Sequence, residues 1–183
     1  MRNLSILEAT PTISEPEKSQ DEKMWEWVRG AFRSLWKDAD NYNLKIVFST
    51  RMNRSAGYAR YKRNRRTGEY EYTIAISQGI WNKTTDEERK DTAVHEACHV
   101  LDHILNGTMS GHKTKWKRLM GLCGYPNPET CHNVSLSGLD GRFDCRCTGC
   151  GRESTLGKIQ VNKMKRDGVN YICRKCKTPY ELI

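Results

Sequence analysis

The chain has 183 residues, of which 37% are hydrophobic, enough for one ordinary domain and a small second module. Lysine and arginine number 31 against 22 acidic residues, and the resulting formal charge of +9 favours a polyanionic partner. The absence of a secretory signal and of any run of 18 apolar residues argues against a secreted or membrane-spanning protein. We therefore expect a soluble cytoplasmic protein, nucleoid-associated in a bacterium, in the host cytoplasm for a virus, or nuclear in a eukaryote. In such reducing compartments, eight cysteines indicate metal ligands rather than disulfides.

The chain begins with about 20 residues rich in Thr, Ser, Pro and Glu, which predict a disordered lead. Apolar residues at helical spacing then predict a helix from residue 21 to about residue 38. Three short strands are expected over 44–50, 56–64 and 70–77, the last two joined by the turn "RRTGE". We expect this sheet to have one buried face and one basic face.

A long helix is predicted next, with a capping box formed by Thr85 and Glu88 at its start and a stop at Gly107. A shorter helix is expected over 112–120, and a small cysteine-bearing module follows. The predicted organisation is thus a lead (1–20), a main α+β domain (21–140) and a C-terminal module (141–183).

The long helix contains "HEACH", in which His95 and His99 lie one turn apart on the same face. Two such imidazoles can share one metal ion, and Glu96 can reach a water on that ion. This His-Glu-x-x-His pattern is typical of zinc metallopeptidases. The alternative is an ordinary amphipathic helix that is rich in histidine.

A catalytic zinc site needs a third protein ligand. His103 lies about 6 Å further along the helix axis than His99 and faces away from the ion, so we expect a helix-surface histidine or one that supports the ligands. His112 can reach the ion, because the short loop before it can span up to about 20 Å and contains Gly107 and Gly111, which allow a reversal. The third-ligand positions of metzincins and gluzincins do not match this sequence.

The stretches "SAGYARY", "YTIAIS", "DTAVHEACH" and "GHKTKWKRLM", in this order, resemble the SprT-like metallopeptidases over roughly residues 22–181. The resemblance implies a zincin-like core, with an N-terminal helix, a three-stranded sheet, the metal-binding helix and a following helix, and then a zinc ribbon. It implies a catalytic zinc held by His95, His99 and His112, with Glu96 as the catalytic base. It also implies a DNA-activated endopeptidase that cuts DNA-bound or DNA-crosslinked proteins, an activity of DNA–protein crosslink repair.

Two Cys-x-x-Cys pairs lie in the C-terminal module, Cys147 with Cys150 and Cys173 with Cys176. Four thiolates at this spacing predict a closed structural zinc site, which supplies folding energy to a segment too small for its own core. Cys145 offers a further thiol, but the two-residue spacing favours Cys147 and leaves Cys145 free. A redox role for the pairs is the alternative.

Cations and tyrosines are interleaved on the second strand and in the C-terminal module, a pattern that suits nucleic acid because exposed bases can stack on the rings. The candidate contacts are Arg60, Lys62, Arg63, Lys163, Lys165, Arg166, Tyr171, Arg174 and Lys175. The expected partners are DNA, single-stranded or containing junctions, and proteins on that DNA; neither a membrane nor an oligomer is expected. The alternatives are a solvated basic face without a ligand and a nucleic-acid-binding zinc protein without catalytic activity.

Overall fold

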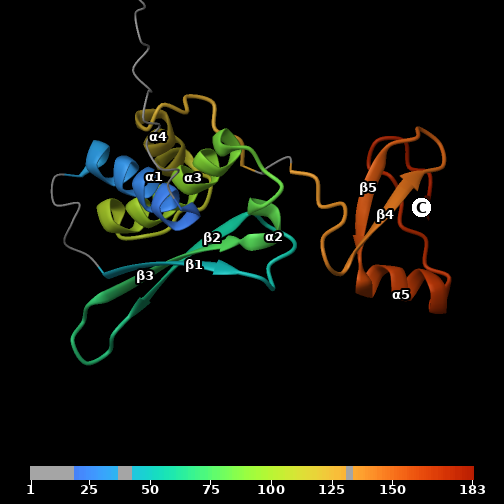
Figure 1. The fold of residues 1–183 in the computed structure, drawn as a ribbon, viewed down its shortest axis with the longest axis horizontal. Helices are drawn as coiled ribbons and strands as arrows, with labels where there is room; N and C mark the ends of the chain where they lie inside the picture. Colours follow the sequence, from blue (N-terminus) through green and yellow to red (C-terminus); the bar gives the residue numbers. More distant parts are fainter. Residues whose placement is uncertain (1–18, 37–42, 131–133) are drawn as a thin grey trace, which may run out of the picture.

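The computed structural model describes residues 19–36, 43–130 and 134–183. The predicted disordered lead lies outside the described residues except for its last two, which already begin the first helix. The described chain contains two three-stranded sheets together with helices, so the predicted α+β class is confirmed (Figure 1). Among these residues, no helix has both the length and the apolar character needed to cross a membrane.

The first sheet contains β1 (Asn43–Ser49), β2 (Gly57–Arg63) and β3 (Tyr70–Ser77) in the order β1-β3-β2. These strands match the three predicted from sequence. β2 and β3 form an antiparallel hairpin, whereas β1 runs parallel to β3, a pairing that the local pattern does not reveal. β3 is therefore the central strand, and β2 lies at an edge.

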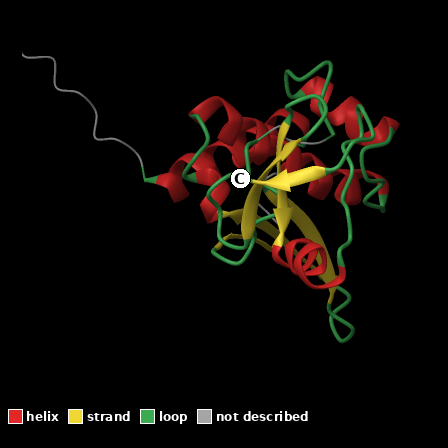
Figure 2. Cartoon of the chain, turned by 90° about the vertical axis from the view of Figure 1, so that its right-hand side faces the viewer, coloured by secondary structure: helices red, strands yellow, loops and turns green. Residues whose placement is uncertain are grey.

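Helices lie on one side of this sheet (Figures 1 and 2): α1 (Gln20–Leu35) and α3 (Asp86–Asn106) cover it, and α4 (Thr114–Leu122) packs against these two helices. The core between these helices and the sheet includes Met24, Val28, Phe32, Ile74, Ile76, Ala97, Leu101, Trp116 and Met120. No helix of the described residues packs on the opposite face of the sheet, where Val47 and Tyr58 are more than one-third exposed. The core thus holds α3 firmly against the sheet.

Both predicted ends of α3 are confirmed. Glu88 N donates to Thr85 Oγ1 at 3.3 Å, and Thr85 N donates to Glu88 Oε2 at 2.8 Å, which completes the capping box. At the other end Gly107 adopts a left-handed conformation with φ of 74°, and its N–H donates to His103 O at 2.8 Å. The helix therefore stops where the reversal towards His112 must begin.

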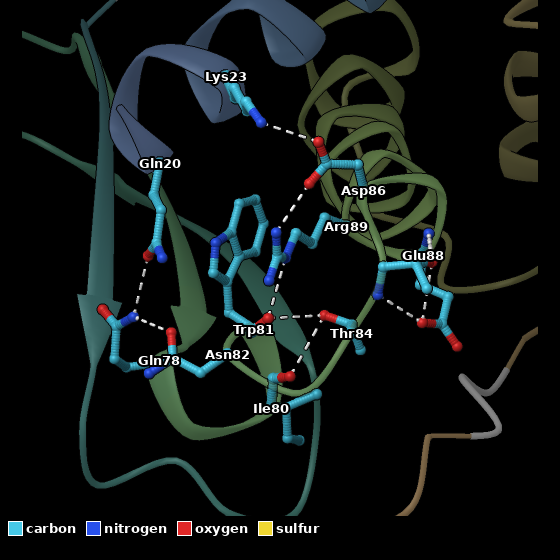
Figure 3. A network of polar contacts seen from close by, with 11 residues as sticks. Gln20, Lys23, Gln78, Ile80, Trp81, Asn82, Thr84, Asp86, Glu88 and Arg89 are labelled. Carbon is cyan, nitrogen blue, oxygen red and sulfur yellow. Dashed lines mark hydrogen bonds and ion pairs between the residues drawn. The ribbon is translucent and has the colours of Figure 1, made fainter. Parts of the chain in front are cut away.

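The first turn of α3 is tied to α1 and to the short helix α2 (Gln78–Trp81) by a polar network (Figure 3). Lys23 Nζ lies 2.9 Å from Asp86 Oδ2, and Arg89 Nη1 donates to Asp86 Oδ1 at 2.7 Å. Arg89 Nε also donates to Trp81 O at 3.0 Å. These contacts fix the direction in which α3 leaves the sheet.

The C-terminal part contains β4 (Arg142–Cys147), β5 (Glu153–Gly157), α5 (Lys158–Asp167) and β6 (Tyr180–Leu182), with strand order β5-β4-β6. Its core has only three buried members, Cys145, Leu156 and Val161. So few apolar residues leave little periodicity, and the sequence accordingly predicted a cysteine module without its strands or helix.

Candidate metal centres and the cleft beside them

Three histidine rings converge at the surface of α3. His95 Nε2 lies 2.9 Å from His112 Nε2, and His99 Nε2 lies 3.2 Å from the same atom. Nitrogen atoms bound at zinc's usual 2.0–2.1 Å in a tetrahedral site would be about 3.3 Å apart. The predicted reach of His112 is therefore realised, and the three residues could hold one metal ion.

The protonation state of His99 suits ligation. Burial and, secondarily, the neighbouring His112 lower the pKa of His99 to about 4. The ring is then neutral near pH 7, which is the form that binds a metal through a nitrogen lone pair.

Trp116 on α4 packs against all three rings. Its ring centroid lies 4.6 Å from that of His95, 5.3 Å from that of His99 and 4.7 Å from that of His112. Its Nε1–H donates to His95 O at 3.3 Å, and the residue is fully buried. The sequence alone assigned no role to Trp116; its place four residues after His112 was the available signal for a positioning role.

A buried carboxylate holds the loop that carries His112. Asp102 is fully buried one turn beyond His99, and its Oδ2 accepts hydrogen bonds from Ser110 N and Ser110 Oγ, each at 2.6 Å. Its Oδ1 accepts from Asn106 Nδ2 at 3.0 Å. The sequence alone did not indicate that Asp102 supports the site. The available sign was that Asp102 directly follows the apolar residues Val100 and Leu101 on the predicted helix.

Glu96 faces the same space and is almost completely buried. Burial raises its pKa to about 8, opposed by a hydrogen bond from the backbone of Ala59. Its Oε2 has no hydrogen-bond partner among the described residues. A divalent cation held by the nearby histidines would favour the ionised form, and the partnerless oxygen leaves Glu96 free to accept a proton.

Gly57 on β2 provides the room that Glu96 occupies. A Cβ added to Gly57 would lie 2.8 Å from Glu96 Cγ and 2.9 Å from Glu96 Oε1. Such distances are shorter than van der Waals contact, so a larger residue would displace the carboxylate. The close approach of strand and helix therefore depends on this glycine.

The histidines and Glu96 line a cleft of about 470 Å³. One wall is the segment from Arg54 to Ala59, which includes the start of β2. Apolar side chains also line it, namely Ala56, Ile80, Met109 and Val134. A separate cavity of about 660 Å³, near Trp36 and Tyr70, contains none of the three converging histidines and no Glu96.

His103 lies outside the histidine group, as expected, but it is not on the helix surface. Its Nδ1 is 3.0 Å from Tyr72 Oη, and its ring centroid is 3.7 Å from that of Tyr61. The expectation of a surface histidine is wrong because β2 and β3 cover this turn of α3 with tyrosine rings.

The four predicted cysteines also converge. The Sγ atoms of Cys147 and Cys176 are 3.2 Å apart, those of Cys150 and Cys173 are 3.8 Å apart, and all four lie within 4.8 Å of one another. Zinc–sulfur bonds of about 2.3 Å correspond to a sulfur separation of about 3.8 Å. Cys145 lies outside this group, buried in the small C-terminal core.

The basic candidates on the first sheet do not share a face. Arg60 and Lys62 alternate with Tyr61 along β2, so they point to the side without helices. Arg63 points the other way, where its Nε donates to Gly68 O at 3.3 Å and its guanidinium lies 6.0 Å from the ring of Tyr70. Any role of these cations in nucleic-acid binding stays a prediction.

The C-terminal candidates lie on α5 and around the second cysteine pair. Lys163, Lys165 and Arg166 are exposed on α5, and Arg174 and Lys175 are exposed between Cys173 and Cys176. Arg166 is paired with Asp167, with its Nε 2.7 Å from Asp167 Oδ1, which reduces its net charge effect. Tyr171 packs against the small core, so its ring is only partly available for stacking.

Comparison with known proteins assigns the chain to a family. The model of the SprT-like family matches residues 25–135, more than half of the chain, and the chain belongs to this family. The matched part runs from α1 through the histidine group and ends before β4. The family therefore accounts for the main part of the fold and for its candidate metal centre.

Individual relatives are distant. Protein SprT of Pseudomonas entomophila is 27% identical over 111 residues, covering 59% of this chain and 66% of the relative, slightly under two thirds. Protein SprT of Shewanella oneidensis is 26% identical over 128 residues, covering 68% of this chain and 74% of the relative. Germ cell nuclear acidic-1 protein of Caenorhabditis elegans is 27% identical over 150 residues, covering 79% of this chain and 26% of that protein. No solved structure shows significant similarity.

Proposed function

We propose that the chain is a zinc-dependent endopeptidase that cleaves proteins bound or crosslinked to DNA. It would have a zincin-like core over 21–140 and a zinc ribbon over 141–183. The observation that carries the proposal is that the Nε2 atoms of His95 and His99 both lie within 3.2 Å of His112 Nε2, beside the buried Glu96. Membership of the SprT-like family supports a metallopeptidase-related role.

The proposed division of labour follows from the positions of these residues. His95, His99 and His112 hold the metal as neutral imidazoles. A zinc ion bound there would polarise the scissile carbonyl and make water more acidic. Glu96 takes the proton from the attacking water through its partnerless oxygen and then delivers it to the leaving amine.

The substrate chain can be seated by the edge of the first sheet. β2 pairs with β3 on one side only among the described residues, and its first residues line the cleft. An extended peptide can add to such an edge through main-chain hydrogen bonds, which hold a backbone without selecting its side chains. The apolar wall formed by Ile80, Met109 and Val134 would receive one side chain of the bound peptide.

The C-terminal part is proposed to hold a structural zinc through Cys147, Cys150, Cys173 and Cys176 and to contact DNA. Support comes from the excess of nine positive charges and from exposed cations on α5 and near the cysteines. Neutralising phosphates with such cations releases counterions and gives affinity that does not depend on sequence. DNA would then bring a DNA-bound protein to the cleft.

The test compares the zinc-loaded protein with its Glu96→Gln variant on a protein crosslinked to single-stranded DNA, to duplex DNA or to nothing. We expect DNA-dependent fragments from the wild type alone. The variant keeps all the metal ligands, so its zinc content and DNA binding should match the wild type. Equal cleavage with and without DNA would leave an endopeptidase but reject the DNA coupling. Absence of fragments with DNA still bound would favour a non-catalytic nucleic-acid-binding zinc protein.

A further inference from the structure

Two arginines from different parts of the chain meet at the start of α5. Arg54 comes from the loop before β2, and Arg142 begins β4. Arg142 Nη1 lies 3.6 Å and Arg54 Nη2 lies 3.8 Å from the position that a Cβ on Gly157 would occupy. Because Gly157 has no side chain, both guanidinium groups can approach the same point.

In the part of the chain that the structure describes, no acidic side chain is paired with these arginines. Neither arginine forms an ion pair with another described residue, and Arg142 Nε donates a hydrogen bond to the carbonyl oxygen of Asn53 at 3.0 Å. Burial and repulsion by Arg54 lower the pKa of Arg142. Two like charges brought together in this way are destabilising unless an anion lies between them.

The backbone around the pair adds to the positive potential. Gly157 is the N-cap of the ten-residue helix α5; its N–H donates to Gln160 Oε1 at 2.9 Å, and the N–H of Lys158 donates to Gly141 O at 3.2 Å. The first turn has no acidic residue and begins with Lys158. The positive end of the helix dipole therefore adds to two guanidinium groups, and together they favour an anion.

We propose that Arg54 and Arg142 form a phosphate-binding site at the seam between the two parts, and that its occupant is a backbone phosphate of DNA. Guanidinium groups suit this ligand because their fixed N–H donors match the phosphate oxygens. The inference rests on the proposed function only for the source of the phosphate; the site itself follows from the convergence of charges.

The location gives the site a specific consequence. Arg54 also lines the cleft that contains Glu96 and the three histidines. Arg142 belongs to the cysteine-bearing part and holds it to the main part through Asn53. A strand of DNA fixed here would lie at the rim of the cleft and would hold the two parts together. A protein attached to that DNA would thus be presented to the cleft.

The experiment measures binding of a labelled single-stranded oligonucleotide to the full zinc-loaded chain by fluorescence anisotropy over a range of salt concentrations. All proteins carry Glu96→Gln, so that proteolysis plays no part in the readout. Arg54→Ala, Arg142→Ala and the double variant are compared with two controls. Arg118→Ala removes one exposed charge from α4, and Asn53→Ala removes the hydrogen bond to Asp140 O at the same seam without changing charge.

We expect the double variant to raise Kd about tenfold, the scale of a lost charge-assisted hydrogen bond. The slope of log K against log salt should fall in magnitude by about 0.7, the value of one phosphate contact on a single strand. The two single effects should combine to less than their product, because both arginines hold one phosphate. If the change in Kd of the double variant equals the product of the two single changes, the arginines do not share a phosphate. A loss of affinity no larger than that of Arg118→Ala would also overturn the proposal. A loss reproduced by Asn53→Ala would mean that seam geometry matters and the charges do not.

A second arm titrates inorganic phosphate against chloride at equal ionic strength and follows the Gly157 amide by NMR. Binding of phosphate to the parent protein and not to the double variant supports the anion site even if no oligonucleotide binds. If phosphate binds but the oligonucleotide does not, DNA binding is removed from the proposed function and free phosphate is the ligand of this site. Without a shift of the amide and without an effect on oligonucleotide binding, the site is rejected.

Discussion

Asp102 and Ser110 are joined by two hydrogen bonds of 2.6 Å, from the backbone N–H and the hydroxyl of Ser110 to one carboxylate oxygen. Ser110 lies two residues before His112, and Asp102 lies one turn after His99 on α3. The pair therefore sets the distance between the helix that provides two metal ligands and the loop that provides the third. Gly111, with φ of 65°, completes the reversal between them.

Weakening this pair should weaken metal binding. In Asp102→Asn an amide replaces the charged acceptor, and zinc affinity should fall about 10- to 100-fold, the usual cost of losing a group that orients a ligand. Competition with a chromophoric chelator measures the change, and the cobalt-substituted protein should show an altered visible spectrum. Asn106→Ala is the matched control, because Asn106 contacts Asp102 without belonging to the His112 loop. Equal affinities in all three proteins would show that the loop holds its position without Asp102.

Gly57→Ala should impair catalysis while leaving the metal in place. The new Cβ would meet Glu96 at 2.8 Å, so the carboxylate must move, whereas the histidines are not touched. We expect kcat to fall about 100-fold, within the range for loss of general-base catalysis, with unchanged zinc content. Gly30→Ala on α1 is the control, since nothing lies within 4 Å of its added Cβ and alanine stabilises a helix by about 1 kcal/mol. Wild-type kcat in Gly57→Ala would show that Glu96 tolerates displacement.

Asp86 should link stability to pH in the acid range. Hydrogen bonds from Lys23 and then from Arg89 lower the pKa of Asp86 below its usual 3.8. Because the folded state favours the ionised form, this contribution is present above pH 3.8 and is lost as the pH falls through the folded pKa. Asp86→Asn should therefore lower Tm at neutral pH, and the difference should narrow below pH 3.8. Glu87→Gln, a change at an exposed acid in the same first turn, should show a smaller effect at neutral pH.

Metal content should separate the two centres. The wild type should hold two zinc ions, whereas Cys173→Ser and His112→Ala should each hold one, because each removes a ligand from a different group. Elemental analysis of dialysed protein counts the ions. Only Cys173→Ser should disorder the C-terminal part, because a core of three buried residues is too small to fold alone.

Cys145→Ser tests the choice among the three neighbouring thiols. Cys145 lies in the small core and outside the cysteine group, so the variant should retain both ions and lose some stability. Loss of the second ion in this variant would instead assign Cys145 as a ligand in place of Cys147.

Local signals along the chain determined much of the main fold. The strands over β1, β2 and β3 follow from alternation of apolar residues, and both ends of α3 follow from Thr85, Glu88 and Gly107. Helical spacing placed His95 and His99 together, and the Cys-x-x-Cys spacing placed each cysteine pair. Each of these features depends on residues within about one helical turn or one strand of each other, so the local sequence is enough to predict it.

Only the tertiary structure decided which distant segments of the chain lie in contact. The parallel pairing of β1 with β3 makes β2 an edge strand and places Gly57 against Glu96. The same packing buries His103 among tyrosines. Arg54 and Arg142 lie 88 positions apart in sequence and meet only because the C-terminal part docks at Asn53. No local pattern encodes these approaches, because each results from the balance of packing over the whole chain.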